Sequence, residues 1–226
     1  MPRRDVSYSA DVGNNVPTMR YVPYDIRARL ETRLRRLDEL AIPFPQNVNE
    51  FAMFCLLLAC FPARPVSYLE IGCRHGGSLY AASGFLPEHS LIIGMDLPGA
   101  AWGDHESEPS LRLIADELTR EGYDAHLILA DSSSSEAKQE LSALLAGRHL
   151  DAIFIDADHT FLGVSSDWNN YRTLVASPGM VAFHDIARRS DTPKVEVYQL
   201  WEELRNDYPH LEVIWQYGIG AIWLNT

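Results

Sequence analysis

The sequence lacks three features that would each place it in a large class of proteins. It has no excess of positive charge, since 19 Lys and Arg residues stand against 31 Asp and Glu, whereas nucleic-acid binding needs a basic face. Its longest apolar run, residues 51–61, is about half as long as a bilayer span. Its three cysteines show no metal-ligand spacing and are too few for a disulfide scaffold. We therefore expect no nucleic acid or membrane as a partner, and a cytoplasmic location.

The N-terminal segment lacks the pattern of a signal peptide, because no apolar stretch follows its basic residues. Apolar residues recur at helical spacing over residues 24–40 and predict an amphipathic helix, which the prolines of "IPFPQN" end. A second, buried helix is expected over residues 51–61, capped by Asn47 or Asn49. We divide the chain into an N-terminal arm and helix (1–46), serving as a lid or as the surface of a homo-oligomer, and a main domain (47–226).

The main domain alternates strand and helix patterns. Near-continuous apolar runs predict strands, each followed by an amphipathic helix, over residues 66–72, 90–96, 125–131, 150–156 and 179–185. Two further runs, 211–216 and 220–225, are separated by three residues, too few for a parallel crossover, so they must pair antiparallel. The sequence predicts an α/β, Rossmann-like, doubly wound sheet of seven strands: five parallel strands and a C-terminal antiparallel hairpin.

A glycine loop, "LEIGCRHGGS" (69–78), joins the first predicted strand to the first helix of the sheet, where open parallel sheets bind ligands. Its spacing G-x-x-x-G-G differs from the G-x-G-x-x-G of dinucleotide sites, and no Gly-Lys-Ser/Thr follows as in a P-loop. Glu70 is unfavourable for a pyrophosphate but suits a cationic ligand. Alternatively, Gly72, Gly76 and Gly77 only form a tight turn.

Acids also end the next two predicted strands. Asp96 stands where a carboxylate accepts hydrogen bonds from ribose hydroxyls. Asp131, in "ADSS", is placed to reach a base or an exocyclic amine; alternatively, it satisfies free backbone donors at the start of a helix. The long loop at 98–108 contains Trp102, a candidate wall of a substrate pocket. His75, in the glycine loop, either contacts the ligand or lies exposed.

The fourth and fifth predicted strands end in a group of ionisable residues. "IFIDADHTF" (153–161) supplies Asp156 and His159, and "FHD" (183–185) supplies His184 and Asp185. Because neighbouring parallel strands bring their carboxyl ends together, these four side chains should converge and form a metal site. His159 suits a general base, or else it caps or packs at the start of the next helix. Asp158 is expected to cap the turn.

Together these features resemble a class I S-adenosylmethionine-dependent methyltransferase, over residues 47–226. The resemblance is carried by E-I-G-x-x-x-G-G-S, the strand-end Asp96, the "AD" of Asp131 and the terminal hairpin. The motif D-x-x-H and the later pair His184–Asp185 are similar to the divalent-metal-dependent O-methyltransferases of the catechol and macrolide-sugar types. "FIDADHTFLGVSSDW" also resembles a bacterial branch that includes cephalosporin-hydroxylase-like proteins and sugar methyltransferases.

The resemblance implies a role for each matching residue. The methionine end of the cofactor, S-adenosylmethionine, would contact Glu70, Gly72, Gly76 and Ser78. Asp96 would hold its ribose and Asp131 its adenine. The implied metal ligands are Asp156 and Asp185, and His184, which converges with them, is a third candidate ligand. The implied catalytic residues are His159, as the base, and Asp156.

His184 departs from the macrolide-sugar type, which has an acid at this position. Because Mg²⁺ prefers oxygen ligands and imidazole suits softer metals, three alternatives follow: Mg²⁺ held by Asp156, Asp185 and waters, a transition metal, or no metal. The implied activity is O-methylation of a hydroxyl on a small molecule, of the sugar or natural-product type. The alternative functions are an S-adenosylmethionine-binding protein without methyl transfer and an NAD-linked oxidoreductase.

Overall fold

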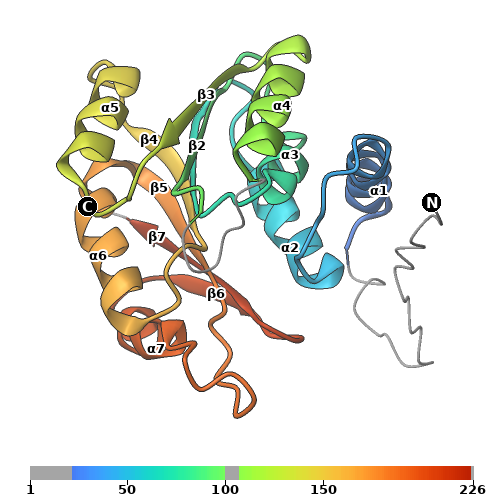
Figure 1. The fold of residues 1–226 in the computed structure, drawn as a ribbon. Helices are drawn as coiled ribbons and strands as arrows, with labels where there is room; N and C mark the ends of the chain where they lie inside the picture. The colour runs from blue at the N-terminus through green and yellow to red at the C-terminus, as the bar shows by residue number, and fades with distance from the viewer. Residues whose placement is uncertain (1–21, 100–106, 225–226) are drawn as a thin grey trace.

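The computed structural model describes residues 22–99 and 107–224. One seven-stranded sheet forms the centre of the molecule, with helices on both faces (Figure 1). The strands are β1 (Ser67–Ile71), β2 (Leu91–Asp96), β3 (Asp124–Leu129), β4 (Leu150–Ile155), β5 (Val175–His184), β6 (His210–Val213) and β7 (Ile219–Leu224). The helices are α1 (Tyr24–Glu39), α2 (Val48–Ala59), α3 (Gly77–Ser83), α4 (Ser107–Arg120), α5 (Ser135–Leu145), α6 (Phe161–Tyr171), the short 3₁₀ helix η2 (Arg172–Leu174) and α7 (Val197–Asp207).

The sheet has the strand order β3-β2-β1-β4-β5-β7-β6. Strands β1 to β5 pair in parallel, and β7 pairs antiparallel with both β5 and β6. The predicted arrangement of five parallel strands and a C-terminal antiparallel hairpin is therefore confirmed. The hairpin departs from the expectation in one detail, because β6 ends at Val213 rather than at residue 216. Residues 214–218 instead turn around a buried carboxylate from α2, described below.

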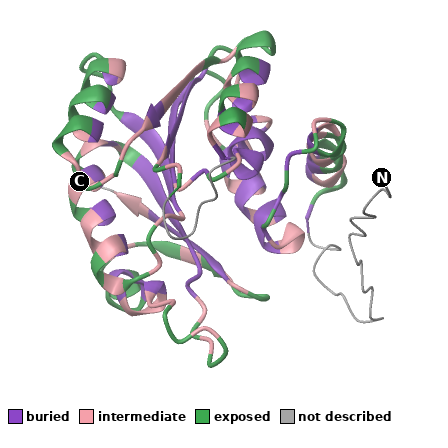
Figure 2. Ribbon diagram, in the orientation of Figure 1, coloured by how far each residue is buried: buried purple, intermediate pink, exposed green. Residues whose placement is uncertain are grey.

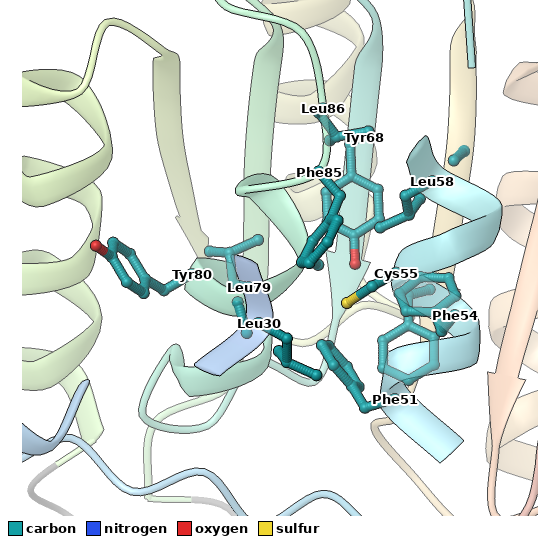
Figure 3. Packing of buried hydrophobic residues seen from close by; sticks show 14 of the residues in the cluster. Leu30, Phe51, Phe54, Cys55, Leu58, Tyr68, Leu79, Tyr80, Phe85 and Leu86 are labelled. Carbon is teal, nitrogen blue, oxygen red and sulfur yellow. The ribbon is translucent and has the colours of Figure 1, made fainter. Parts of the chain in front are cut away.

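Two apolar layers hold the helices on the sheet. On β1, Tyr68 belongs to the cluster shared with α1 to α4, whereas Leu69 and Ile71 belong to the cluster shared with α5 to α7. This alternation follows from the period of two in a strand. Figure 2 shows the central strands of the sheet buried between the exposed outer faces of the helices, whereas the edge strands β3 and β6 are more exposed. Figure 3 shows Phe54 and Leu58 of α2 gathered with Tyr68 in the first of these layers.

The predicted N-terminal helix is α1, and it packs on the main domain. Its Ile26, Leu30 and Leu37 are buried in the same apolar layer as α2 to α4. Arg33 donates from Nε and Nη2 to the Tyr80 carbonyl on α3 and lies over the Tyr80 ring, 3.5 Å from its centroid. The described part of the N-terminal region thus belongs to the same core as the sheet.

Among the described residues, no helix is both long enough and apolar enough to span a membrane.

Candidate active site

A cavity of about 790 Å³ opens at the carboxyl ends of the parallel strands. It lies over the boundary between β1 and β4, where the strand order reverses, which is where open α/β sheets bind ligands. The cavity is lined by most of the residues that the sequence singled out, namely Gly72, His75, Ser78, Asp96, Asp131, Asp156, Asp158, His159, His184 and Asp185. The structure therefore brings the glycine loop and the ionisable cluster into one site.

The glycine loop packs directly against the end of β4. Gly72 has a φ of +93°, and a Cβ added there would lie 2.2 Å from the backbone oxygen of Asp156, so only glycine allows this approach. Gly72 N–H donates to the Met95 carbonyl at 2.8 Å, and Asp156 N–H donates to the Ile71 carbonyl at 2.8 Å. Gly76 precedes α3 with a φ of +84° and serves the turn; it does not line the cavity.

Glu70 lies beneath the loop rather than at the cavity surface. Its side chain is fully buried, and its carboxylate accepts hydrogen bonds from Ser78 Oγ at 2.5 Å and from Tyr68 Oη at 2.9 Å. Burial raises the pKa of Glu70 to about 8, and these two hydrogen bonds only partly offset that effect. Glu70 therefore reaches the cavity through Ser78, which lines it.

Asp96 and Asp131 both line the cavity at the ends of β2 and β3. Asp96 Oδ2 accepts a hydrogen bond from the Arg74 N–H at 2.6 Å, while burial raises the pKa of Asp96. Asp131 Oδ1 accepts from the N–H and the Oγ of Ser133 at 2.8 and 2.7 Å, which lowers the pKa of Asp131. Asp131 thus closes the turn before α5 and also borders the cavity.

The four predicted ionisable groups converge at the ends of β4 and β5. His184 Nδ1 lies 3.0 Å from Asp156 Oδ1 and 3.4 Å from Asp185 Oδ2. His159 Nε2 lies 2.9 Å from Asp185 Oδ2 and 3.6 Å from Asp156 Oδ1. Asp185 directly follows β5 and lies in the left-handed region, with a φ of +59°, a conformation that is strained for a residue with a side chain and is concentrated at functional sites.

The cluster holds its members in the charged form. Burial lowers the pKa of His159 and of His184, but hydrogen bonds and charge from Asp156 and Asp185 outweigh it and raise both values to about 10. Burial raises the pKa of Asp156 and Asp185, but the two imidazoles outweigh it and hold both carboxyl pKa values below their usual range. The carboxylates thus favour the protonated form of each imidazole, and the imidazoles favour the ionised form of each carboxyl group.

Three side chains of the cluster form a set of ligand atoms for a divalent cation. Asp156, His184 and Asp185 each offer one ligand atom, and these atoms lie within 4.8 Å of one another. Two carboxylates and an imidazole from neighbouring strands fit a divalent ion. Whether the ion is Mg²⁺ depends on the imidazole, because Mg²⁺ prefers oxygen.

Sequence reasoning missed three residues at this site. Gln46 lines the cavity, and its Nε2 donates to Asp156 Oδ2 at 2.7 Å. Tyr217 also lines the cavity, with its ring 5.6 Å from the His184 ring. Glu50, fully buried on α2, holds the turn that carries Tyr217. A lone acid directly before the apolar run 51–61 was the available signal for Glu50; Gln46 and Tyr217 had none.

Glu50 organises residues 214–218 through backbone hydrogen bonds. Its Oε1 accepts from the N–H of Trp215 at 2.6 Å, of Gln216 at 2.5 Å and of Gly218 at 3.0 Å. The Tyr217 N–H reaches both carboxylate oxygens. Because these N–H groups point at one carboxylate, the chain leaves the β6 ladder after Val213.

The smaller predictions have mixed outcomes. Asp158 caps the turn as predicted, since its Oδ1 accepts from the Thr160 N–H at 2.9 Å, and Thr160 in turn caps α6 by accepting from the Gly163 N–H. Of the two proposed caps of α2, Asn47 is the one, accepting from the N–H groups of Asn49 and Glu50. Trp102 lies outside the described residues.

Comparison with known protein families gave one match. The family described as a methyltransferase domain matches residues 69–186, just over half of the chain. The match runs from the glycine loop to the residue after Asp185, so it spans all the strand ends that form the cavity. No curated protein sequence matched significantly.

Solved structures of similar fold include several methyltransferases. The O-methyltransferase from Bacillus cereus, in complex with SAH, has a TM-score of 0.59 at 16% identity and covers 87% of this chain and 91% of its own. The O-methyltransferase TomG from Streptomyces achromogenes, involved in tomaymycin synthesis and solved with SAM, has a TM-score of 0.58 at 13% identity, with 94% and 100% covered. The mycinamycin-pathway methyltransferase MycE, solved with Mg, SAH and mycinamycin VI, has a TM-score of 0.58 at 14% identity, with 87% of this chain and 55% of MycE covered.

Proposed function

The chain belongs to the methyltransferase domain family that its residues 69–186 match, and we propose that it transfers the methyl group of S-adenosylmethionine to a hydroxyl of a small molecule. One observation carries the proposal. The glycine loop and the ionisable cluster line one cavity and meet where Gly72 packs on the Asp156 backbone. A cofactor held at the ends of β1 to β3 would therefore present its methyl group beside the groups at the ends of β4 and β5.

The ends of β1 to β3 offer a binding surface suited to this cofactor. Asp96, whose Oδ2 already accepts from the Arg74 N–H, would accept further hydrogen bonds from the ribose hydroxyls. Asp131 would face the adenine. Ser78, backed by Glu70, would border the methionine end. Acidic groups around the cavity favour a cofactor that carries a sulfonium and an ammonium charge.

The ends of β4 and β5 would activate the acceptor. In the transfer, the hydroxyl oxygen attacks the methyl carbon, the carbon–sulfur bond breaks with its electron pair left on sulfur, and His159 takes the hydroxyl proton. A divalent cation between Asp156 and Asp185 would supply positive charge that lowers the pKa of a bound hydroxyl. The same two carboxylates orient His159, because its Nε2 lies within 2.9 Å of Asp185.

The charge state of His159 supports a role for such a cation. Two carboxylates raise the pKa of His159 to about 10, and an imidazole that holds its proton at neutral pH cannot accept another. Positive charge shared by Asp156 and Asp185 would weaken their hold on this proton and bring the pKa of the base toward neutrality.

The acceptor is proposed as a natural-product or sugar-type hydroxyl. This rests on the two similar structures, one involved in tomaymycin synthesis and the other from the mycinamycin biosynthetic pathway and solved with mycinamycin VI and Mg. The residues 1–46 are proposed as a lid or as the surface of a homo-oligomer, and the location is proposed as cytoplasmic.

Titration calorimetry tests the cofactor. We expect wild-type protein to bind S-adenosylmethionine and not NAD⁺, and Asp96→Ala to weaken binding by at least about tenfold, since loss of a hydrogen bond to a charged group costs about 1.5–3 kcal/mol. Asp116→Ala, an exposed acid on α4, is the matched control. Tight NAD⁺ binding without S-adenosylmethionine binding would overturn the proposal.

Transfer of a labelled methyl group to a panel of hydroxylated sugars and macrolides, with and without EDTA, tests the reaction. We expect transfer to at least one acceptor and its loss in EDTA. Cofactor binding without transfer to any acceptor would favour the alternative of a binding protein.

A further inference from the structure

The metal-binding donor set of this chain contains a nitrogen that is built into the fold. His184 is the last residue of β5 and is 6% exposed. Its ring packs between Phe154, at a centroid distance of 6.3 Å, and Tyr217, at 5.6 Å. Its Nδ1 faces the carboxylates, 3.0 Å from Asp156 Oδ1. Since aromatic rings border it, the imidazole cannot easily turn away and leave its place to a water.

Asp156 is restricted to one free oxygen. Gln46 Nε2 donates to Asp156 Oδ2 at 2.7 Å, so Oδ1 is the oxygen that faces His184 and His159. The opposite orientation of the Gln46 amide would set its carbonyl oxygen against a carboxylate, so the donor must point at Asp156. Gln46 is 9% exposed, and this hydrogen bond fixes the direction of the carboxylate as outer partners of metal ligands do.

The turn held by Glu50 also restricts the His184 imidazole. It places Tyr217 against the His184 ring. The turn cannot move without breaking its backbone hydrogen bonds to Glu50. The ligand atoms are thus one imidazole nitrogen, from His184, and one carboxylate oxygen each from Asp156 and Asp185. Packing and hydrogen bonds hold His184 and Asp156 in place.

We propose that this site selects a first-row transition-metal dication, such as Co²⁺ or Zn²⁺, over Mg²⁺. Imidazole nitrogen suits zinc, iron and nickel, and affinity at mixed nitrogen and oxygen sites rises along the first-row series. Mg²⁺ requires near-octahedral oxygen ligands and gives up its waters reluctantly. The selectivity concerns metal binding only, so it stands or falls independently of the methyl transfer proposed above.

Equilibrium dialysis of untagged, chelator-treated full-length protein against Co²⁺, Zn²⁺ or Mg²⁺, each alone, measures the selectivity. We expect Kd values for Co²⁺ and Zn²⁺ that are at least about tenfold lower than that for Mg²⁺. The visible absorption of the Co²⁺ complex gives a second readout that needs no variant, because nitrogen ligation shifts its d–d bands from those of aqueous Co²⁺.

Two variants distinguish the proposed ligand, His184, from the positioning residue, Gln46. His184→Asp should weaken Co²⁺ binding by at least about tenfold, shift the d–d bands and narrow the preference over Mg²⁺. Gln46→Met should weaken Co²⁺ and Mg²⁺ binding alike, by roughly tenfold, and leave the bands in place. His149→Asp, an exposed histidine just before β4, should change neither.

Three results would overturn the proposal: Mg²⁺ binding as tight as Co²⁺ binding, no binding of any of the three ions, or a His184→Asp variant with unchanged Co²⁺ affinity and bands. The second result would identify the cluster as a set of ion pairs without a metal.

Discussion

At the scale of single residues, the site is governed by buried charges that control one another. Asp156 and Asp185 raise the pKa of His159 and His184, and each imidazole lowers the carboxyl pKa in return. Glu70, outside this cluster, has no cationic partner among the described residues, and burial raises its pKa to about 8. Buried carboxyl groups in and beneath the cavity wall therefore have opposite pKa shifts, because their partners differ.

His159→Ala should abolish methyl transfer while leaving the cofactor bound. Loss of a general base typically lowers the rate by about 10²–10⁴-fold, and His159 lies at the end of β4, away from the proposed ribose and adenine contacts on β2 and β3. The labelled-methyl assay measures the first effect and calorimetry with S-adenosylmethionine the second. His149→Ala is the control for removing a histidine. A parallel loss of cofactor binding would show that His159 serves structure rather than proton transfer.

Glu70→Gln should become stabilising as the pH rises. The folded-state pKa of Glu70, about 8, exceeds its ordinary value of 4.5, so its contribution to stability is fully present below pH 4.5 and is lost as the pH rises through 8. Between these limits, unfolding free energies of Glu70→Gln and wild type should diverge in favour of the variant by up to about 1.4 kcal/mol per pH unit. Urea unfolding of cofactor-free protein at several pH values measures this; Glu140→Gln, exposed on α5, should follow wild type. A constant difference would contradict the raised pKa.

At the scale of elements, α2 and its preceding segment connect parts of the site that are distant in sequence. Gln46 reaches Asp156 on β4, Asn47 Nδ2 donates to Gln216 Oε1 at 3.0 Å, and Glu50 holds the β6–β7 turn. Pro43 meets the start of α3, where a Cβ on Gly77 would lie 2.2 Å from the Pro43 oxygen. Pro43, Pro45 and Gln46 therefore form part of the cavity wall, at the predicted boundary at residue 46, and Asn47 and Glu50 hold the turn next to it.

Glu50→Ala should loosen the β6–β7 turn. The change would leave the N–H groups of residues 215–218 without their shared acceptor; the hydrogen bond of Gly218 is buried and the other three are partly buried, and an unpaired buried group costs about 1–3 kcal/mol. We expect a loss of unfolding free energy of about 3 kcal/mol or more. Hydrogen exchange at residues 215–218 should accelerate before exchange in β1 or β4 does. Glu140→Ala, on the surface of α5, is the control; unchanged exchange in the turn would refute the role of Glu50.

At the scale of the whole molecule, negative charge is the dominant property. The formal net charge is −12, and self-repulsion of this size destabilises a compact chain. The acids that line the cavity add to the same sign, which favours a cationic cofactor and metal ions over nucleic acid.

Salt should therefore stabilise the protein at neutral pH. Raising NaCl from about 20 to about 200 mM shortens the screening length, and we expect the Tm at pH 7.5 to rise by a few degrees. Near pH 5, close to the isoelectric point of about 5.0, the same change should have little effect, which serves as the internal control. An equal rise at both pH values would mean that salt acts through something other than net charge.

Predictability differed between the fold and the site. The parallel sheet and its hairpin could be predicted because strand and helix periods, glycines and loop lengths are local properties. The convergence of Asp156, His159, His184 and Asp185 could also be predicted, since strand ends meet at one edge of a parallel sheet. The position of Glu70 below Ser78 could not be predicted from the sequence. It depends on how the glycine loop turns, which decides whether Glu70 or Ser78 faces the cavity.

The sequence by itself determined the order of elements, the edge of the sheet that binds ligands and the residue types available there, because each follows from short-range pattern and strand direction. Only the tertiary structure decided that Gln46 holds one oxygen of Asp156, that Glu50 brings Tyr217 against His184, and that Asp156 and Asp185 raise the pKa of both imidazoles. The contacts of Gln46 with Asp156 and of Glu50 with Gly218 join residues 110 and 168 positions apart. Their geometry and their pKa values depend on burial and on distances that exist only once the layers have packed.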